Sequence, residues 1–145
     1  MNPVLEQMRS YTGREFSDTP SPFMRWLAPT LVSAEEGTLI FSYTVRKEML
    51  NPAGTLHGGV TAGIIDDSIG ATVISLDLPD VYTTINNAID YFAPAFENDV
   101  IEARTSVVKQ GRQIINLACE VWMPAKNRLV AKGASNMMRI AAQNR

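Results

Sequence analysis

Residues 51–70 read NPAGTLHGGVTAGIIDDSIG, and this stretch opens the segment that decides the fold. From Gly58 onward the residues are mostly apolar or small, and the pattern continues without a proline to Leu76. The pattern predicts one long helix over residues 58–76, ending before the loop sequence DLPD. A helix that is apolar nearly all round must be covered on most of its sides by other elements.

The segments on either side of this helix have the patterns of β-strands. Alternating apolar residues, or enrichment in Thr, Ile and Tyr, predict strands at residues 38–45, 81–91, 100–109, 113–123 and 128–140. Because strands and helices do not alternate along the chain, a parallel doubly wound sheet is not expected. The prediction is an α+β fold in which an antiparallel sheet wraps around one long central helix.

The N-terminal region is expected to add a short helix and a loop. Apolar residues at helical spacing predict a helix over residues 3–11, and the sequence SDTPSP indicates a loop over residues 17–22. An apolar cluster follows, made of Phe23, Met24, Trp26 and Leu27. We expect residues 1–30 to form this N-terminal helix and loop, and residues 31–145 to form one domain.

Composition narrows the possible partners. The 145 residues are 46% hydrophobic and 19% charged, which fits a single globular domain. The net charge of −2 offers no basic stripe for nucleic acid. No apolar run approaches the ~20 residues that a membrane span needs, and the N-terminus lacks the pattern of a secretory signal. A cytoplasmic protein without nucleic-acid or membrane partners is expected.

The chain has one cysteine, Cys119, and one histidine, His57. These numbers exclude an internal disulfide framework and a Cys/His zinc site with four ligands. Cys119 lies in an alternating apolar run over residues 115–123, so a buried core thiol is expected. We therefore expect no metal site.

Two adjacent carboxylates, Asp66 and Asp67, interrupt the apolar helix. Charged groups in such a setting are costly unless they are paired, hydrogen-bonded or used. Asp66 shares its helix face with small residues, so a ligand or another backbone can approach it closely. Asp67 shares a bulkier face that is typical of core packing. The periodicity favours Asp66 as the working carboxylate. The alternative for either aspartate is a structural role, in a hydrogen bond to a neighbouring strand or in a salt bridge.

His57 stands directly before Gly58 and Gly59 at the expected start of the helix. Backbone N–H groups are bare at a helix start, and the helix dipole adds partial positive charge there. A capping or core histidine is the alternative to a functional one. Together with the out-of-place carboxylate, these features indicate a hydrolytic site.

The spacing of His57 and Asp66 has a geometric consequence. Nine helical positions separate them by roughly 13 Å, whereas a group that acts on a substrate lies within about 3 Å of it. If both side chains serve one site, they come from two chains. The helix then packs near a symmetry axis.

The order of elements resembles the hotdog fold, and the motif Asn51-x5-His57-Gly58-Gly59-x6-Asp66 resembles the PaaI-like branch of acyl-CoA thioesterases. The resemblance covers about residues 32–139. It implies that the sheets of two chains pair into a homodimer, with pairing of two dimers into a tetramer expected. The apolar cluster of residues 16–27 has no counterpart in the family, so the resemblance does not predict which acyl group is preferred.

The resemblance also implies roles for individual residues. The N–H of Gly58 polarises the thioester carbonyl, and Asp66 of the opposing subunit activates water or attacks directly. Asn51 and His57 orient the water and the carbonyl, and Thr84 supports Asp66. The residues implied to bind substrate or CoA are Gly59, Asn86, Tyr91, Lys109, Gln110, Gly111 and Arg112. For Lys109 and Arg112 a solvated hairpin turn is the alternative. CoA is part of the substrate, and no cofactor is implied.

The expected activity is hydrolysis of an acyl-CoA thioester. A thioester needs only a polarising N–H and a carboxylate-bound water, and the chain has neither a Gly-x-Ser-x-Gly elbow nor a P-loop. Two alternatives remain, an enoyl-CoA hydratase or dehydratase on the same fold and a non-catalytic acyl-CoA-binding module.

Overall fold

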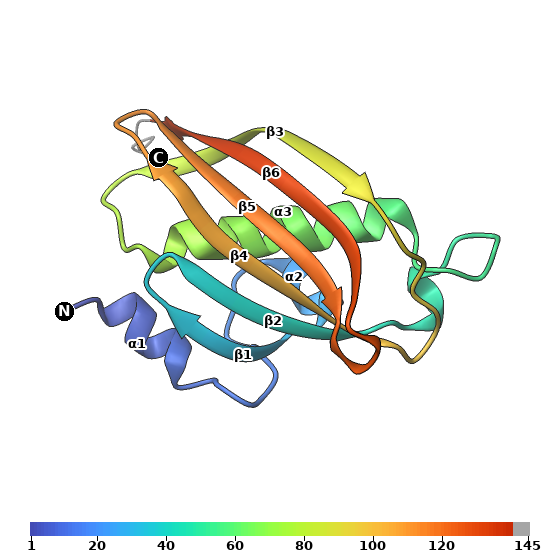
Figure 1. Ribbon diagram of the computed structural model, residues 1–145. Coiled ribbons are helices and arrows are strands. Elements are labelled where there is room, and N and C mark those ends of the chain that lie inside the picture. Colours follow the sequence, from blue (N-terminus) through green and yellow to red (C-terminus); the bar gives the residue numbers. More distant parts are fainter. Residues whose placement is uncertain (141–145) are drawn as a thin grey trace.

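The structure is a computed structural model that describes residues 1–140 (Figure 1). The last five residues of the predicted domain 31–145 lie outside this range. Six antiparallel strands form one sheet in the order β1-β2-β4-β5-β6-β3. The strands are β1 (Thr30–Glu35), β2 (Thr38–Thr44), β3 (Val81–Tyr91), β4 (Val100–Gln110), β5 (Ile114–Met123) and β6 (Arg128–Ile140).

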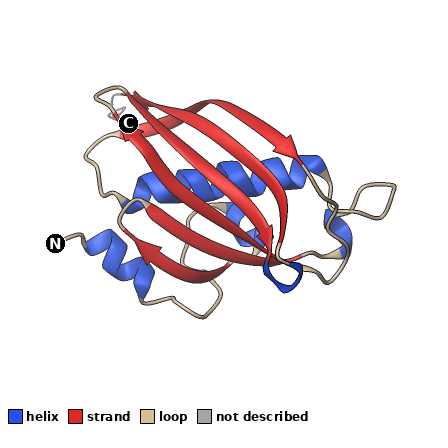
Figure 2. Ribbon diagram, in the orientation of Figure 1, coloured by secondary structure: helices blue, strands red, loops and turns tan. Residues whose placement is uncertain are grey.

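One long helix, α3 (Gly58–Ser75), runs along one face of this sheet and contacts strands β2 to β6 (Figure 2). Its apolar residues Ile64, Ile65 and Ile69 are fully buried. Buried hydroxyls on the helix are satisfied locally, since Ser68 donates to the carbonyl of Ile64 and Thr72 donates to that of Ser68. The predicted α+β class, with an antiparallel sheet around one long helix, is confirmed.

The N-terminal segment adds two short helices, α1 (Pro3–Arg9) and α2 (Pro22–Leu27). The remaining helical turns are η1 (Lys47–Met49) and η2 (Pro124–Lys126). Asn2 caps α1 by accepting from the N–H of Leu5, and its amide donates to the carbonyl of Ser75 at 2.7 Å. This last bond ties α1 to the carboxyl end of α3.

One strand and one helix in this region are not predicted by the sequence pattern. The first predicted strand covers residues 38–45, but β1 precedes it, with an irregularity in pairing between Leu31 and Ser33 that breaks the alternation. Residues 23–27 are predicted only as an apolar cluster. They form α2, because Ser21 caps the helix and Pro22 occupies its first turn.

Helix α2 packs closely on α3 at Gly63. A Cβ added to Gly63 would lie 2.6 Å from the ring of Phe23, so only glycine allows this approach. Cys119 is buried in the core, as its alternating run predicts. Within residues 1–140 no helix is both long and apolar enough to cross a membrane.

Candidate active site

His57 caps the amino end of α3. Its Nδ1 accepts a hydrogen bond of 2.8 Å from the N–H of Gly59, so in the neutral imidazole the proton is assigned to Nε2. The side chain is exposed, which leaves the Nε2–H free to act as a donor. The neighbouring N–H of Gly58 is in the first turn, where the helix supplies no acceptor and its dipole favours negative charge.

Asn51 holds the loop that leads into His57. Its Oδ1 accepts from the N–H groups of Ala53 and Thr55 at 3.0 and 3.1 Å, and its Nδ2 donates to the hydroxyl of Thr55 at 2.8 Å. The structure therefore shows Asn51 bonded within its own turn. Its implied role in orienting water stays a prediction.

Tyr91 lies against the same helix start, at the end of β3. Its hydroxyl donates to the carbonyl of Gly58 at 2.8 Å. Its ring would lie 3.6 Å from a Cβ added to Gly58, an ordinary contact distance. His57, Gly58, Gly59 and Tyr91 thus form one group at the amino end of α3.

Asp66 receives two hydrogen bonds from β3. The hydroxyl of Thr84 and the amide of Asn87 both donate to its Oδ1, at 2.9 and 3.0 Å. These bonds fix the orientation of the carboxylate, and among residues 1–140 they leave Oδ2 without a protein donor. The sequence analysis identified Thr84 but missed Asn87.

A β-bulge explains why both residues reach Asp66. Residues three apart in a regular strand lie on opposite faces of the sheet. In the β3–β6 pair, Thr84 lies opposite Met137 and Asn86 lies opposite Asn136, so Ile85 is an extra residue. Because of this extra residue, the side chains of Asn87 and Thr84 lie on the same face of the sheet, the face that is covered by α3. Sequence alternation alone carries no signal of this irregularity.

Asp67 differs from Asp66 in its hydrogen bonding. Its Oδ2 is buried and accepts no hydrogen bond from the described residues, and the same holds for the hydroxyl of Tyr43 in the core. Burial, together with the neighbouring charge of Asp66, raises the pKa of Asp67 to about 6. Asp67 also lines the same pocket as Asp66, so the preference for Asp66 as the working carboxylate stays a prediction.

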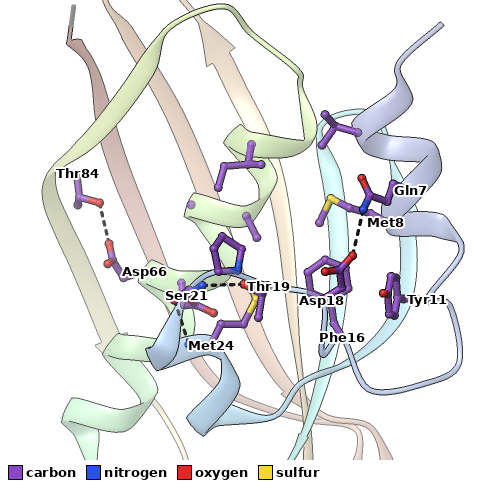
Figure 3. Close-up of a pocket in the computed structure, with 16 residues that line it drawn as sticks. Gln7, Met8, Tyr11, Phe16, Asp18, Thr19, Ser21, Met24, Asp66 and Thr84 are labelled. Carbon is purple, nitrogen blue, oxygen red and sulfur yellow. Dashed lines mark hydrogen bonds between the residues drawn. The ribbon is translucent and has the colours of Figure 1, made fainter. Parts of the chain in front are cut away.

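Asp66 and Thr84 open onto a pocket of about 520 Å³ (Figure 3). Helix α3 forms one wall, and residues 4–24 form most of the rest. Gly70 lies on the helix wall, where an added Cβ would meet no atom within 4 Å. The small-residue face predicted around Asp66 therefore borders open space at Gly70, whereas Phe23 covers it at Gly63.

The β4–β5 turn carries the predicted basic residues. The N–H of Gly111 donates to the carbonyl of Ile114 at 2.8 Å, and an added Cβ on Gly111 would lie 2.9 Å from that oxygen. A second pocket lies beside this turn and is lined by Lys109, Gly111, Arg112, Gln113, Ile114, Asn116 and Asn136. Gln110 is in the same turn but does not line the pocket.

Asn86 is linked to this second pocket by a row of amides. Its Oδ1 accepts from Asn136 Nδ2 at 3.0 Å, and Asn136 Oδ1 accepts from Asn116 Nδ2 at 2.8 Å. The three asparagines are in register across β3, β6 and β5, with Lys109 opposite Asn116 on β4. Asn86 and the basic turn therefore share one region of the sheet.

The predicted residues thus fall into three groups within one chain. His57, Gly58 and Tyr91 lie at the amino end of α3, Asp66 and Thr84 lie near its middle, and the basic turn lies at the far end of β4. At about 1.5 Å per residue, roughly 12 Å of helix separates Gly58 from Asp66. Burial raises the pKa of Cys119 to about 12, which keeps this thiol protonated and removes it as a nucleophile.

Comparison with known proteins identifies the family. A sequence model of the Thioesterase superfamily matches residues 53–127. Human acyl-coenzyme A thioesterase 13 is 31% identical over 104 residues, which are 72% of this chain and 74% of that protein. The structure of the PaaI protein from the phenylacetic acid degradation operon of E. coli superposes with a TM-score of 0.78 at 23% identity, covering 86% of this chain and 88% of that one.

A third similar structure is a hypothetical thioesterase protein from Streptococcus pneumoniae with coenzyme A. It matches with a TM-score of 0.73 at 23% identity and covers 80% of this chain and 88% of that one. The fold is therefore the hotdog fold of thioester hydrolases, as the order of elements and the motif at residues 51–66 implied. The chain belongs to the Thioesterase superfamily.

Proposed function

We propose that this protein hydrolyses acyl-CoA thioesters, with Asp66 as the carboxylate that activates the attacking water. The observation that carries the proposal is the setting of Asp66. It borders the pocket between α3 and residues 4–24, and two donors on β3 hold its Oδ1. The named relative, human acyl-coenzyme A thioesterase 13, supports the same substrate class.

The chemistry needs few groups. Water adds to the thioester carbonyl carbon while Asp66 accepts one of its protons, and the carbonyl oxygen gains negative charge. The N–H of Gly58, assisted by the helix dipole, stabilises that charge. The carbon–sulfur bond then breaks, and the CoA thiolate leaves and takes up a proton.

The separation along α3 supports a site to which two subunits contribute these groups. Gly58 and His57 of one chain lie too far from Asp66 of the same chain to meet one carbonyl, so we place them across a homodimer interface. Strand β3 is at the edge of the sheet, and the exposed side chains of Val81, Ile85 and Phe92 lie on or just after it. An open edge of this kind is suited to pairing with a second copy.

The nucleotide end of CoA is assigned to the pocket beside the β4–β5 turn. Lys109 and Arg112 supply positive charge there, and Asn116 and Asn136 supply amide groups suited to hydrogen bonding. The S. pneumoniae protein of the same fold, with coenzyme A in its structure, supports a CoA site on this scaffold.

The decisive experiment measures thiol release from short, long and aromatic acyl-CoAs by the purified full chain. We expect Asp66→Asn to lower kcat by about 10²–10⁴-fold, because an amide cannot accept the proton of the water. Asp67→Asn is the matched control, since it makes the same charge change one residue away, and we expect a much smaller loss. If Asp67→Asn were the inactive variant, the assignment of Asp66 would be wrong. Addition of water to an enoyl-CoA without thiol release would point to a hydratase instead.

A further inference from the structure

The pocket between α3 and residues 4–24 has a catalytic side and a distal side. Figure 3 shows Asp66 and Thr84 on one side of it and Gln7, Tyr11 and Asp18 on the opposite side. A substrate whose thioester carbonyl lies at Asp66 would therefore direct its acyl chain toward the N-terminal segment. This step rests on the proposed function.

The N-terminal wall is packed firmly on the rest of the fold. Met8 and Met24 line the pocket and are buried, with 5% and 3% of their surface exposed. The bond from Asn2 to Ser75 and the contact of Phe23 with Gly63 hold α1 and α2 against α3. This wall precedes residue 53, where the match to the superfamily model begins.

The length of the pocket follows from its helix wall. The lining residues of α3 form one stripe from Asp66 to Ile74, with Gly70 and Ala71 between them. Eight helical residues span about 12 Å, which accommodates an extended chain of roughly eight to ten carbons. Because Gly70 has no side chain, the middle of this path is open.

The charged side chains that line the pocket are all acidic. Its charged lining residues are Asp18, Asp66 and Asp67, and no Lys or Arg is among the described residues that line it. Asp18 is exposed at the distal side, where Gln7 donates a hydrogen bond of 3.1 Å to its Oδ2. An acyl group ending in a carboxylate would meet like charge there, which disfavours its binding.

We propose that the wall built by residues 4–24 selects the acyl group, admitting an extended uncharged chain of roughly eight to ten carbons along the Asp66–Ile74 stripe and excluding chains that end in a carboxylate. The open path over Gly70 sets the length of the acyl chain that fits. Charge selection is set by Asp18, which lies across the pocket from Asp66.

The test compares octanoyl-CoA with butyryl-CoA and with the octanedioic acid monothioester of CoA. Gly70→Leu places a side chain in the path, so the octanoyl-to-butyryl ratio of kcat/KM should fall at least tenfold. Asp18→Asn should lower the octanoyl-to-octanedioyl ratio about threefold, the size expected for an exposed charge. Glu36→Gln is the control, because it makes the same charge change at an exposed position outside the pocket.

Binding of two thioether analogues, S-octyl-CoA and S-(7-carboxyheptyl)-CoA, gives a readout that does not need turnover. The wild-type protein should bind S-octyl-CoA more tightly than S-(7-carboxyheptyl)-CoA. In the Asp18→Asn variant the difference in affinity between the two compounds should be smaller. If acyl-CoAs are hydrolysed but Gly70→Leu and Asp18→Asn change neither ratio, the pocket assignment is overturned while the proposed activity stands. If the analogues bind with this preference but no acyl-CoA is hydrolysed, the proposed activity fails while the pocket assignment stands.

Discussion

At the scale of single residues, the two adjacent aspartates differ because the helix turns them toward different surroundings. Asp66 faces β3, where Thr84 and Asn87 donate to one of its oxygens. Asp67 has an oxygen that is buried without a donor among the described residues. Adjacent positions on a helix point about 100° apart, which is enough to bring one carboxylate to the donors of β3 and to turn the other away from them.

The first prediction concerns the donors that orient Asp66. Thr84→Val removes one hydroxyl, and Asn87→Ala removes one amide. Each should lower kcat by roughly five- to tenfold with little change in KM, because hydrogen bonds to charged groups are stronger than neutral ones but these lie near the surface. The measurement is steady-state thiol release.

Thr84→Ser provides the control for this prediction, since it keeps the hydroxyl and loses only the methyl group. It should retain most of the wild-type kcat. A Thr84→Ser variant as slow as Thr84→Val would show that the methyl packing matters rather than the hydrogen bond. The double variant should lose less than the product of the single losses, because both donors bind the same oxygen.

The second prediction concerns stability and the protonation of Asp67. Its pKa is about 6 in the folded chain, against an ordinary value of 3.8, so the folded state holds this proton more tightly than the unfolded state does. The stabilising contribution is complete below pH 3.8 and is lost as the pH rises through about 6. Asp67→Asn should therefore be more stable than wild type at pH 8, by about 1 kcal/mol after allowing for partial exposure.

Urea unfolding between pH 4 and pH 8 measures this difference. The advantage of Asp67→Asn should shrink toward zero near pH 4. Asp77→Asn, in the loop after α3, is the comparison variant with the same chemical change. An advantage that grows as the pH falls would contradict the burial of Asp67.

At the scale of elements, the amino end of α3 and the β4–β5 turn are each built by local bonds. His57 caps the helix, and Gly111 closes the turn because a side chain there would collide with the carbonyl of Ile114. The turn carries Lys109 and Arg112 beside a pocket. Its positive charge is available for phosphate groups.

The third prediction tests that turn. Lys109→Ala/Arg112→Ala should raise KM for acyl-CoA about tenfold and flatten its dependence on salt, because screened attraction to phosphates is lost. The ratio of kcat/KM for acyl-CoA to that for an acyl-N-acetylcysteamine thioester, which lacks the nucleotide, should fall accordingly. The control is Lys126→Ala/Arg128→Ala at the β5–β6 turn, with the same charge change. Equal losses on both substrates would assign the basic turn to folding instead.

At the scale of the whole molecule, one chain holds the parts of a site without bringing them together. Gly58 and Asp66 lie on one straight helix, so no rearrangement of loops places them around the same carbonyl. If the α3 helices of two chains packed antiparallel about a two-fold axis, Gly58 of each chain would lie near Asp66 of the other. Two equivalent sites would then form at once.

The fourth prediction follows from this arrangement. His57→Ser keeps an oxygen that can cap α3 and removes the imidazole, and Asp66→Asn removes the base. Each homodimer should be inactive at both sites. In a mixed dimer one site has both changes and the other has neither, so equal co-refolding should restore roughly a quarter of wild-type activity.

Differently tagged chains establish how many mixed dimers form. A site within one chain would give no recovery, since every site would then carry one change. A preparation shown to be mixed and still inactive would overturn the shared site.

The sequence by itself determined the elements whose pattern is local. The apolar run from Gly58, the Thr-rich strands and the motif from Asn51 to Asp66 were sufficient for the helix, for five of the six strands and for the superfamily. Local spacing also favours Asp66 over Asp67 as the working carboxylate, and this stays a prediction. These features depend on residues near each other in the chain, where periodicity and turn chemistry are informative.

The tertiary structure alone decided which distant residues meet. The bulge at Ile85 brings Asn87 to Asp66, and the amide row joins Asn86 to the basic turn. The N-terminal segment folds onto α3 and completes the pocket, because Gly63 admits Phe23 and Asn2 reaches Ser75. Such contacts depend on strand register and on close packing between elements far apart in sequence, which no local pattern encodes.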